Sequence, residues 1–267
     1  RILKEVDKID IVNVVGIEDY LKGVLPCEVN RLWPFETLKA QAIASRSYAV
    51  YESLRRQKKR YDVTADTFSQ VYKGKTRENW RTTQAVLKTE GMVLEYGGSV
   101  FPGYFHSSCG GHTADVEKVW SKEMDPLQGK KCGYCKVSPY FRWRIRLSTK
   151  TILEKLIEKG YQIKRIDNIK LSERDESGRV EYVSIRAWNK WFEIDTNDFR
   201  NAIGKRLLKS SNFNIKKYPF FYVFSGYGWG HGVGMCQWGA FGMGLRWKKT
   251  GTILEYYYPG TKISNLK

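Results

Sequence analysis

Glycine occupies every second position from Gly226 to Gly234, in a segment that also contains His231. Glycine permits positive φ angles and lets a backbone approach a ligand or another segment closely. The run matches neither a phosphate loop, because no Gly-Lys-Ser/Thr follows it, nor a dinucleotide fingerprint in a βαβ setting. Two interpretations remain open: a loop that lines a carbohydrate or peptide groove, with His231 as a candidate general base, or a strand-to-helix turn whose glycines relieve packing.

The most clearly predicted element is a long helix that continues to about Arg55. Pro34 and Glu36 are typical of a first helical turn, where the missing proline N–H is harmless and an acidic side chain meets the positive end of the helix dipole. Small residues along this helix predict tight packing on one face. A shorter amphipathic helix is predicted over 17–25, and Pro26 is expected to end or kink it.

Helix-like and strand-like segments both occur along the whole chain, which predicts an α+β fold. Strand-like residues at 143–147 and a helix over 150–159 give the middle of the chain a character of its own. We therefore expect a mixed main domain, formed by residues 1–140 and 218–267, with an inserted smaller α+β lobe at 141–217.

The charge of the chain favours a polyanionic partner. Its 267 residues include 46 Lys and Arg against 28 Asp and Glu, a formal net charge of +18. Such a surplus is attracted to phosphates, anionic membranes and envelope polymers, although a solvated basic surface is the plainer alternative. No apolar run approaches the roughly 18 residues that cross a bilayer. We expect membrane attachment only through a segment absent from this chain.

Five ordered blocks of the sequence resemble the stage II sporulation protein D family, which includes peptidoglycan lytic transglycosylases. The first block covers 21–49 and joins Leu-Lys-Gly-Val-Leu-Pro-Cys-Glu to the start of the long helix. The other four blocks are Ser69–Tyr72, His106–Thr113, Gly228–Ala240 and Tyr257–Thr261. Because the blocks keep their order over nearly the whole chain, the resemblance is far more specific than any single motif.

The resemblance implies a glycan-cleaving enzyme in which Glu28 is the catalytic acid/base. In such enzymes one carboxyl group protonates the glycosidic oxygen between N-acetylmuramic acid (MurNAc) and N-acetylglucosamine (GlcNAc). The muramoyl 6-hydroxyl then attacks the anomeric carbon and leaves a 1,6-anhydroMurNAc end. This chemistry requires no cofactor and no second carboxylate as nucleophile. Glu28 also lies among apolar neighbours, where lost hydration favours a protonated carboxyl. A helix cap or an ion-pair partner is the plainer interpretation of such a residue.

Two basic residues of the long helix match basic positions of the family. Lys39 and Arg46 lie seven residues apart, about two helical turns, and are expected to project from the same face. They are predicted to bind substrate or to orient Glu28, with plain surface cations as the alternative. The remaining substrate-binding candidates are Gln70, Tyr72, His106, Ser107, His231 and Gln237.

The cysteines have the spacing of a structural zinc site, in which two C-x-x-C/H pairs supply four tetrahedral ligands. The predicted ligand set is Cys109, His112, Cys132 and Cys135. His106 is a substitute for His112, and a disulfide is the alternative to zinc. Cys27 and Cys236 are predicted to be buried thiols near the groove and neighbours of each other.

Two other functions remain open. Some members of the family resemble activators of cell-wall amidases, so a non-enzymatic glycan-binding activator is the main alternative. A metal-dependent amidase is a third hypothesis, raised by the zinc ligands. The expected partners are peptidoglycan glycan strands, a cell-wall amidase and other envelope proteins, and not nucleic acid. The expected location is extracytoplasmic, in the bacterial cell envelope, in a full-length form that is membrane-anchored or secreted.

Overall fold

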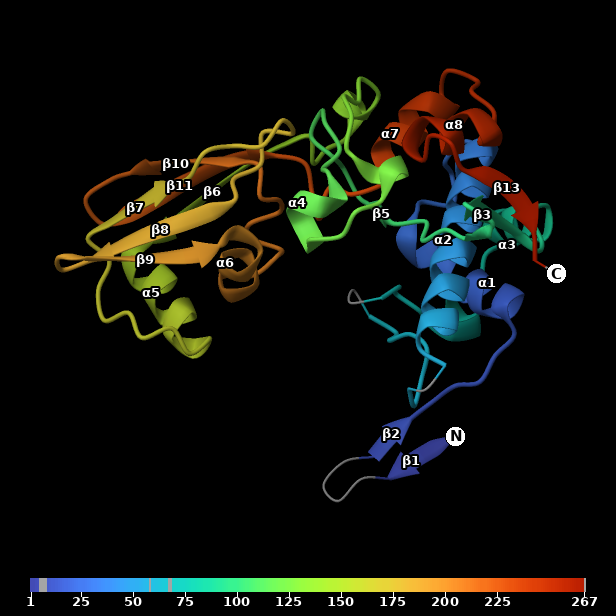
Figure 1. The fold of residues 1–267 in the computed structure, drawn as a ribbon, viewed down its shortest axis with the longest axis horizontal. Coiled ribbons are helices and arrows are strands. Elements are labelled where there is room, and N and C mark those ends of the chain that lie inside the picture. Colours follow the sequence, from blue (N-terminus) through green and yellow to red (C-terminus); the bar gives the residue numbers. More distant parts are fainter. Residues whose placement is uncertain (5–8, 58, 67–68, 267) are drawn as a thin grey trace. The chain divides into compact units, whose positions relative to one another are not determined.

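The computed structural model describes residues 1–4, 9–57, 59–66 and 69–266 (Figure 1). The chain forms two units, Arg1–Tyr104 with Met243–Lys267, and Phe105–Gly242. Eight α-helices and 13 strands lie in the described residues, which confirms the predicted α+β class. The predicted lobe at 141–217 falls inside the second unit, and residues 105–140 belong to that unit as well.

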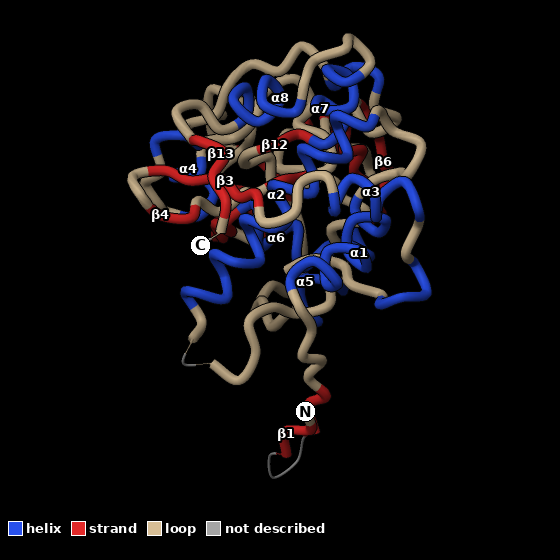
Figure 2. The backbone as a smooth tube through the Cα atoms, turned by 90° about the vertical axis from the view of Figure 1, so that its right-hand side faces the viewer, coloured by secondary structure: helices blue, strands red, loops and turns tan. Residues whose placement is uncertain are grey.

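The first unit is mainly helical, with a small antiparallel sheet of strand order β13-β3-β4 and a separate ribbon of β1 and β2 (Figure 2). Its elements are β1 (Ile2–Lys4), β2 (Ile9–Ile11), α1 (Ile17–Glu28), α2 (Phe35–Arg55), a 3₁₀ turn (Gly74–Arg77), α3 (Trp80–Leu87), β3 (Met92–Tyr96), β4 (Ser99–Val100), α8 (Thr250–Tyr257) and β13 (Lys262–Asn265).

Helix α2 is the predicted long helix, and its middle is buried on all sides. Every residue from Ala40 to Ser47 is buried, so its small side chains serve more than the single packed face that the sequence predicts. The helix contacts α1, α3, α8 and β3. A Cβ atom on Gly103 would lie only 2.5 Å from the carbonyl oxygen of Ala44. Small residues therefore let several elements pack closely around one helix.

Helix α1 does not end at Pro26 but continues for two residues to Glu28. The backbone N–H of Val29 donates to the carbonyl of Leu25 at 3.1 Å and closes the last turn. Proline lacks an N–H and removes one helical hydrogen bond, a loss that costs less in a last turn than in mid-helix. Glu28 consequently stands at the carboxyl end of α1.

The second unit contains two three-stranded antiparallel sheets, of order β10-β11-β6 and β7-β8-β9, and a short parallel pair, β12-β5 (Figure 1). Its elements are β5 (Phe105–His106), α4 (Val116–Trp120), 3₁₀ turns at Asp125–Leu127 and Cys135–Val137, β6 (Arg142–Ser148), α5 (Thr149–Glu158), β7 (Asn168–Leu171), β8 (Tyr182–Ala187), β9 (Lys190–Asp195), α6 (Thr196–Ile203), β10 (Phe213–Lys217), β11 (Phe221–Tyr227) and β12 (Met235–Cys236), followed by α7 (Gln237–Gly244).

One hydrophobic core joins the two larger sheets of the second unit to α5 and α6, and its members run from Trp143 to Phe224. The Phe213 and Phe224 rings meet edge to face, with centroids 5.6 Å apart. This core extends past the predicted end of the lobe at residue 217, because β11 pairs with both β10 and β6. Among the residues that the structure describes, none of the helices has both the length and the apolar character needed to traverse a bilayer.

Candidate active site and cysteine cluster

The side chain of Glu28 is half-buried at the carboxyl end of α1. Its Oε1 accepts a hydrogen bond from the backbone N–H of Val71 at 3.0 Å. Glu28 lines a pocket of about 560 Å³ that lies wholly in the first unit. The pocket residues are Pro26, Cys27, Glu28, Val29, Asn30, Arg31, Thr76, Arg77, Glu78 and Asn79.

The segment that donates this hydrogen bond is fixed against α1 and α2. The Tyr20 hydroxyl donates to Oε1 of Gln70 at 3.2 Å, and the rings of Tyr20 and Tyr72 stack with centroids 5.2 Å apart. Gly23 makes this stacking possible, because a Cβ atom there would lie 2.6 Å from Cε2 of Tyr72. Gln70 is fully buried, so it positions the segment, whereas half-buried Tyr72 stays a candidate for substrate contact.

Arg46 is enclosed in the first unit and pairs with Glu18 of α1. Its Nε and Nη2 donate to the two carboxylate oxygens of Glu18 at 2.8 and 2.6 Å, and Nη1 donates to the carbonyl of Met92 at 3.0 Å. The Arg46 side chain is 0% exposed. The structure therefore corrects the prediction that Arg46 binds substrate. Its guanidinium fixes α1 against α2 and so acts on the position of Glu28 only through the helix.

Lys39 forms a different ion pair. Its Nζ lies 2.8 Å from Oε1 of Glu36, one helical turn earlier. Glu36 also accepts hydrogen bonds from the backbone and hydroxyl of Thr250. Burial raises the pKa of Glu36, but the hydrogen bonds from Lys39 and Thr250 outweigh this effect and lower the pKa to about 2. Lys39 thus supports the junction of α2 and α8, and because it is partly exposed, a substrate contact stays a prediction.

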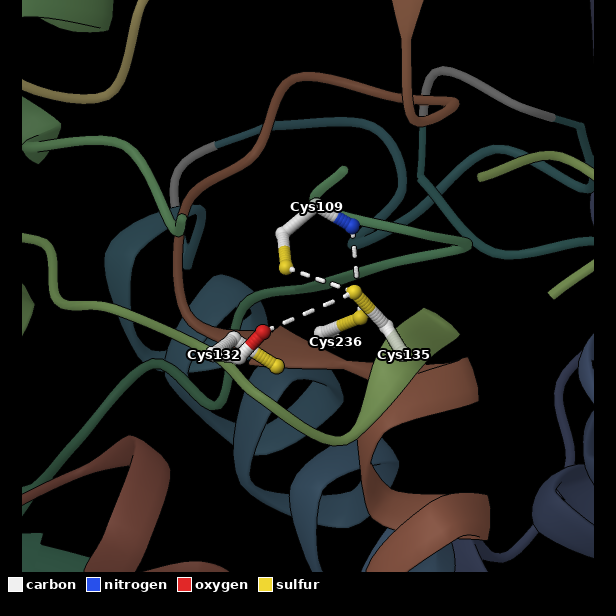
Figure 3. Close-up of side chains that lie close together, drawn as sticks. All are labelled: Cys109, Cys132, Cys135 and Cys236. Atoms are coloured by element: carbon white, nitrogen blue, oxygen red, sulfur yellow. Dashed lines mark hydrogen bonds between the residues drawn. The ribbon is translucent and has the colours of Figure 1, made fainter. Parts of the chain in front are cut away.

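Four cysteine side chains of the second unit converge: Cys109, Cys132, Cys135 and Cys236 (Figure 3). Their sulfur atoms all lie within 4.8 Å of one another, and all four residues are buried. The sulfurs of Cys109 and Cys135 are 3.4 Å apart. A tetrahedral zinc with Zn–S bonds of about 2.3 Å places its sulfurs about 3.8 Å apart. The cluster therefore has the donor type, number and approximate spacing of a tetrathiolate metal site.

Groups around the cluster suit deprotonated sulfur. The backbone N–H groups of Cys109 and Gly239 both donate to Sγ of Cys236 at 3.2 Å. Arg179 is buried, donates to the carbonyl of Cys109 at 3.2 Å, and brings a positive charge close to the thiols. Burial, together with the neighbouring Cys109, Cys132 and Cys135, raises the pKa of the Cys236 thiol in the absence of a cation. A divalent cation would stabilise four thiolates in this setting, so the residues fit a metal ion.

His112 does not belong to the cluster, which corrects the predicted ligand set. Its Nδ1 lies 2.7 Å from the carbonyl of Thr113, and the residue lines a separate pocket of about 610 Å³. Cys236 takes the fourth place because β12 pairs in parallel with β5, which sets Cys236 opposite His106. Cys236 lies two residues after the last glycine of the run, outside any C-x-x-C motif, so its place in the cluster follows from strand pairing and not from a local motif. Cys27 lies in the first unit and is only half-buried.

The alternating glycines pack against neighbouring backbone and side chains. A Cβ atom on Gly228 would lie 2.4 Å from the carbonyl oxygen of Ser108, and one on Gly232 would lie 2.3 Å from Nη2 of Arg179. Both glycines have positive φ, 78° and 90°. Trp229 and Ser108 also exchange backbone hydrogen bonds at 2.7 and 3.0 Å. These contacts favour the packing interpretation of the run, which leads directly into β12.

Two histidines flank this packing, and both are held neutral. Nε2 of His231 donates to the carbonyl of Phe105 at 2.9 Å, while Nδ1 accepts from the Val233 N–H at 3.1 Å. Burial lowers the pKa of His231 to about 4 and that of His106 well below its usual range. His231 therefore lacks a free nitrogen for the predicted role of general base. Nδ1 of His106 bonds the Val233 carbonyl at 3.0 Å, and its Nε2 has no hydrogen-bond partner within the described residues.

Comparison with known proteins gives these features a family context. A family model described as stage II sporulation protein matches residues 5–96, and a domain of unknown function matches residues 116–234. The stage II sporulation protein D of Bacillus amyloliquefaciens is 29% identical over 94% of this chain and 74% of its own length. An uncharacterized protein of Brachyspira hyodysenteriae is 40% identical over 96% of this chain and 69% of its own length.

This chain belongs to the stage II sporulation protein D family. The resemblance seen in the sequence blocks is thereby confirmed. A protein named amidase enhancer, from Bacillus subtilis, is 29% identical over 92% of this chain. The chain spans only 40% of that longer protein.

The predicted site residues of this family member divide between the two units. Glu28, Lys39, Arg46, Gln70 and Tyr72 belong to the first unit, and His106, Ser107, His231, Gln237 and the cysteine cluster belong to the second. Gln237 is buried at the start of α7, and the carbonyl of Ser107 accepts the backbone N–H of Trp238 at 3.0 Å. Substrate contacts by Ser107 and Gln237 stay predictions.

Proposed function

We propose that the protein is a peptidoglycan lytic transglycosylase that cleaves the MurNAc–GlcNAc glycosidic bond, with Glu28 as its general acid/base. The observation that carries this proposal is the setting of Glu28: a half-buried carboxyl at a pocket, with one oxygen fixed by the Val71 N–H at 3.0 Å. Arg31 and Arg77 line the same pocket. Their charge suits the carboxylates that peptidoglycan carries on its peptides.

The proposed reaction needs only one carboxyl group. Protonated Glu28 gives its proton to the glycosidic oxygen as the bond from that oxygen to C1 of MurNAc breaks. The MurNAc 6-hydroxyl oxygen then bonds to C1, and its proton returns to the Glu28 carboxylate. Water is not consumed, and the product ends in 1,6-anhydroMurNAc. A hydrolytic glycosidase, by contrast, requires a second carboxylate as base or nucleophile.

The test compares the wild type with Glu28→Gln and Glu78→Gln on purified glycan strands. Glu78 lines the same pocket but is exposed, so Glu78→Gln is a matched control. The wild type and the control are expected to release fragments with anhydro ends, whereas Glu28→Gln loses about 100-fold or more in rate. Thermal unfolding verifies that each variant is folded. Unchanged activity of folded Glu28→Gln contradicts the proposal.

A second candidate function is a non-enzymatic activator of a cell-wall amidase. The similarity to the amidase enhancer favours it. An activator binds glycan strands and raises the rate of a separate amidase without cutting glycan itself. In that case the wild type releases no anhydro ends, and Glu28→Gln stimulates the amidase as well as the wild type does.

We also propose that the cysteine cluster binds a structural zinc ion. Support comes from four buried sulfurs within 4.8 Å of one another. Four protein ligands leave no coordination position for water, which disfavours a metal-dependent amidase. Metal analysis is expected to find one zinc per chain in the wild type and in His112→Ala, and a strong loss in Cys236→Ser. If Cys236→Ser keeps its zinc and His112→Ala loses it, the ligand set with His112 in place of Cys236 is correct. If the wild type contains disulfides and no zinc, the disulfide alternative is correct.

The proposed substrate assigns the protein to the extracytoplasmic envelope. Peptidoglycan is the proposed partner there, together with a cell-wall amidase if the activator function holds. The net charge of +18 suits a compartment rich in anionic polymers and phospholipids. Recovery of the protein from fractionated cells checks this location, and a purely cytoplasmic pool contradicts it.

A further inference from the structure

The β8–β9 and β10–β11 hairpin turns of the second unit lie at the same end of its two larger sheets (Figure 1). Both turns expose large aromatic side chains. Trp188, in the β8–β9 turn, is 64% exposed, and Trp191 of β9 is 46% exposed. Phe220, in the β10–β11 turn, is 83% exposed. Asp167 joins the two turns, because its carboxylate accepts the Trp188 N–H and its carbonyl accepts Nζ of Lys217. We call this surface, formed by 164–170, 182–193 and 214–221, the aromatic end.

The aromatic end has a surplus of positive charge. Its three segments contain seven Lys and Arg against two acidic residues, Asp167 and Glu193. Asp167 already forms an ion pair with Arg165. The surface is therefore strongly cationic, and its charge stands next to its most exposed apolar side chains.

Cations lie directly over the two indole rings. The Arg165 guanidinium lies 4.5 Å from the ring centroid of Trp188, and Nζ of Lys170 lies 5.1 Å from that of Trp191. Each contact covers part of a ring with charge and leaves the rest of the indole exposed. Sugar recognition usually needs a free ring face with polar hydrogen-bonding groups around it. These rings are instead paired with cations, and Phe220 offers no polar group at all.

The backbone of Trp188 adds an independent observation. Trp188 has φ 56°, in the left-handed region that glycine occupies without cost and that a bulky residue rarely adopts. The first position of such a two-residue hairpin turn favours glycine. A large indole therefore occupies a position where the turn itself is better served by glycine, which points to a role for the exposed side chain outside the fold.

We propose that the aromatic end binds the surface of a membrane rich in anionic phospholipid. Such a surface offers phosphates to the cations and an apolar boundary to the rings, and indole side chains favour the zone between headgroups and acyl chains. A soluble polyanion supplies only the first of these and leaves Phe220 in water. The proposal is independent of glycan cleavage, because none of the residues that it uses is a predicted catalytic or substrate-binding residue, and Glu28 lies in the other unit.

The test measures flotation of the full chain with vesicles of phosphatidylcholine alone and of phosphatidylcholine mixed with phosphatidylglycerol. The decisive variant is Trp188→Gly, which relieves the positive φ and so keeps or raises the unfolding midpoint. Trp247→Gly is its matched control, because Trp247 is 89% exposed, has φ 58° and lies in the first unit. Phe220→Ser tests the second turn. Lys190→Gln tests the charge, with exposed Lys88→Gln of the first unit as its control.

We expect the wild type to bind the anionic vesicles and not those of phosphatidylcholine alone. Trp188→Gly and Phe220→Ser are each expected to weaken binding about tenfold, and Lys190→Gln about fivefold. The control variants bind as the wild type does, and added salt weakens all binding. Absence of wild-type binding to anionic vesicles at low salt overturns the proposal. Normal vesicle binding by Trp188→Gly also overturns it. So does a result in which the protein binds isolated wall polymers but not vesicles, and in which the Trp188, Phe220 and Lys190 variants weaken that polymer binding.

Discussion

Replacing Arg46 by Met is expected to destabilise the first unit strongly. The change removes two charge-assisted hydrogen bonds to Glu18 and one each to the carbonyls of Met92 and Val86, all from a side chain that is 0% exposed. Removing one partner of a buried ion pair costs about 3–5 kcal/mol, because the other charge remains unpaired. Glu18 is 19% exposed and keeps some hydration. The lower end of that range, about 3 kcal/mol, is therefore expected.

The measurement is urea or thermal unfolding of the wild type, Arg46→Met, Arg46→Lys and Lys39→Met. Arg46→Lys keeps the charge but not the two-pronged geometry, so a loss of about 1–2 kcal/mol is expected. Lys39→Met is the control on the same helix, since its partly exposed pair with Glu36 is expected to contribute less than about 1 kcal/mol. A double-mutant cycle with Glu18→Gln isolates the coupling between the two side chains.

A different result would return Arg46 to its predicted role in binding substrate. If Arg46→Met unfolds at the same denaturant concentration as the wild type while KM for glycan strands rises, the assignment of Arg46 as a positioning residue is refuted. If stability falls while the activity of the folded fraction is kept, the structural assignment holds.

Two further predictions concern Tyr72 and the imidazole of His231. In Gly23→Ala the new Cβ atom would lie 2.6 Å from Cε2 of Tyr72, so the Tyr72 ring is expected to be displaced. The rate of glycan cleavage is expected to fall strongly, whereas the free energy of unfolding is expected to fall only slightly. Gly251→Ala, at a helical glycine with open space around it, is the control and is expected to stabilise by about 0.5–1 kcal/mol. The free energy of unfolding is expected to fall as pH drops from about 6.5 towards 4, because the unfolded chain protonates His231 while burial holds its folded pKa at about 4. Urea titrations at several pH values are expected to show that His231 accounts for a loss of about 2–3 kcal/mol in the free energy of unfolding. His231→Asn is expected to reduce this pH-dependent loss. An unchanged pH profile in that variant contradicts the lowered pKa of His231.

Local signals in the sequence predicted the parts of the fold that depend on near neighbours. Pro34 directly before α2 and Glu36 in its first turn mark the start of that helix, and the amphipathic spacing at 150–159 becomes α5 within one residue at each end. Helix α1 extends three residues beyond the predicted end at residue 25, because the sequence shows that Pro26 lacks an N–H but not how little that loss costs in a last turn.

Partners that are distant in sequence escaped prediction. Arg46 carries the same charge whether it faces solvent or Glu18, and only the packing of α1 on α2 decides between them. Sequence spacing identified Cys109, Cys132 and Cys135, because each belongs to a pair of candidate ligands only three positions apart. The fourth, Cys236, depends on the pairing of β12 with β5, which no local pattern indicates.

The mass of the product ends tests the central claim most directly. Purified glycan strands are incubated with the wild type in water enriched in heavy oxygen, and the released fragments are analysed by mass spectrometry. Transglycosylation by Glu28 predicts fragments that are lighter than hydrolysis products by one water and carry no heavy oxygen, and their absence from Glu28→Gln. Fragments that carry heavy oxygen at the reducing end, or no fragments from the wild type at all, would contradict the account.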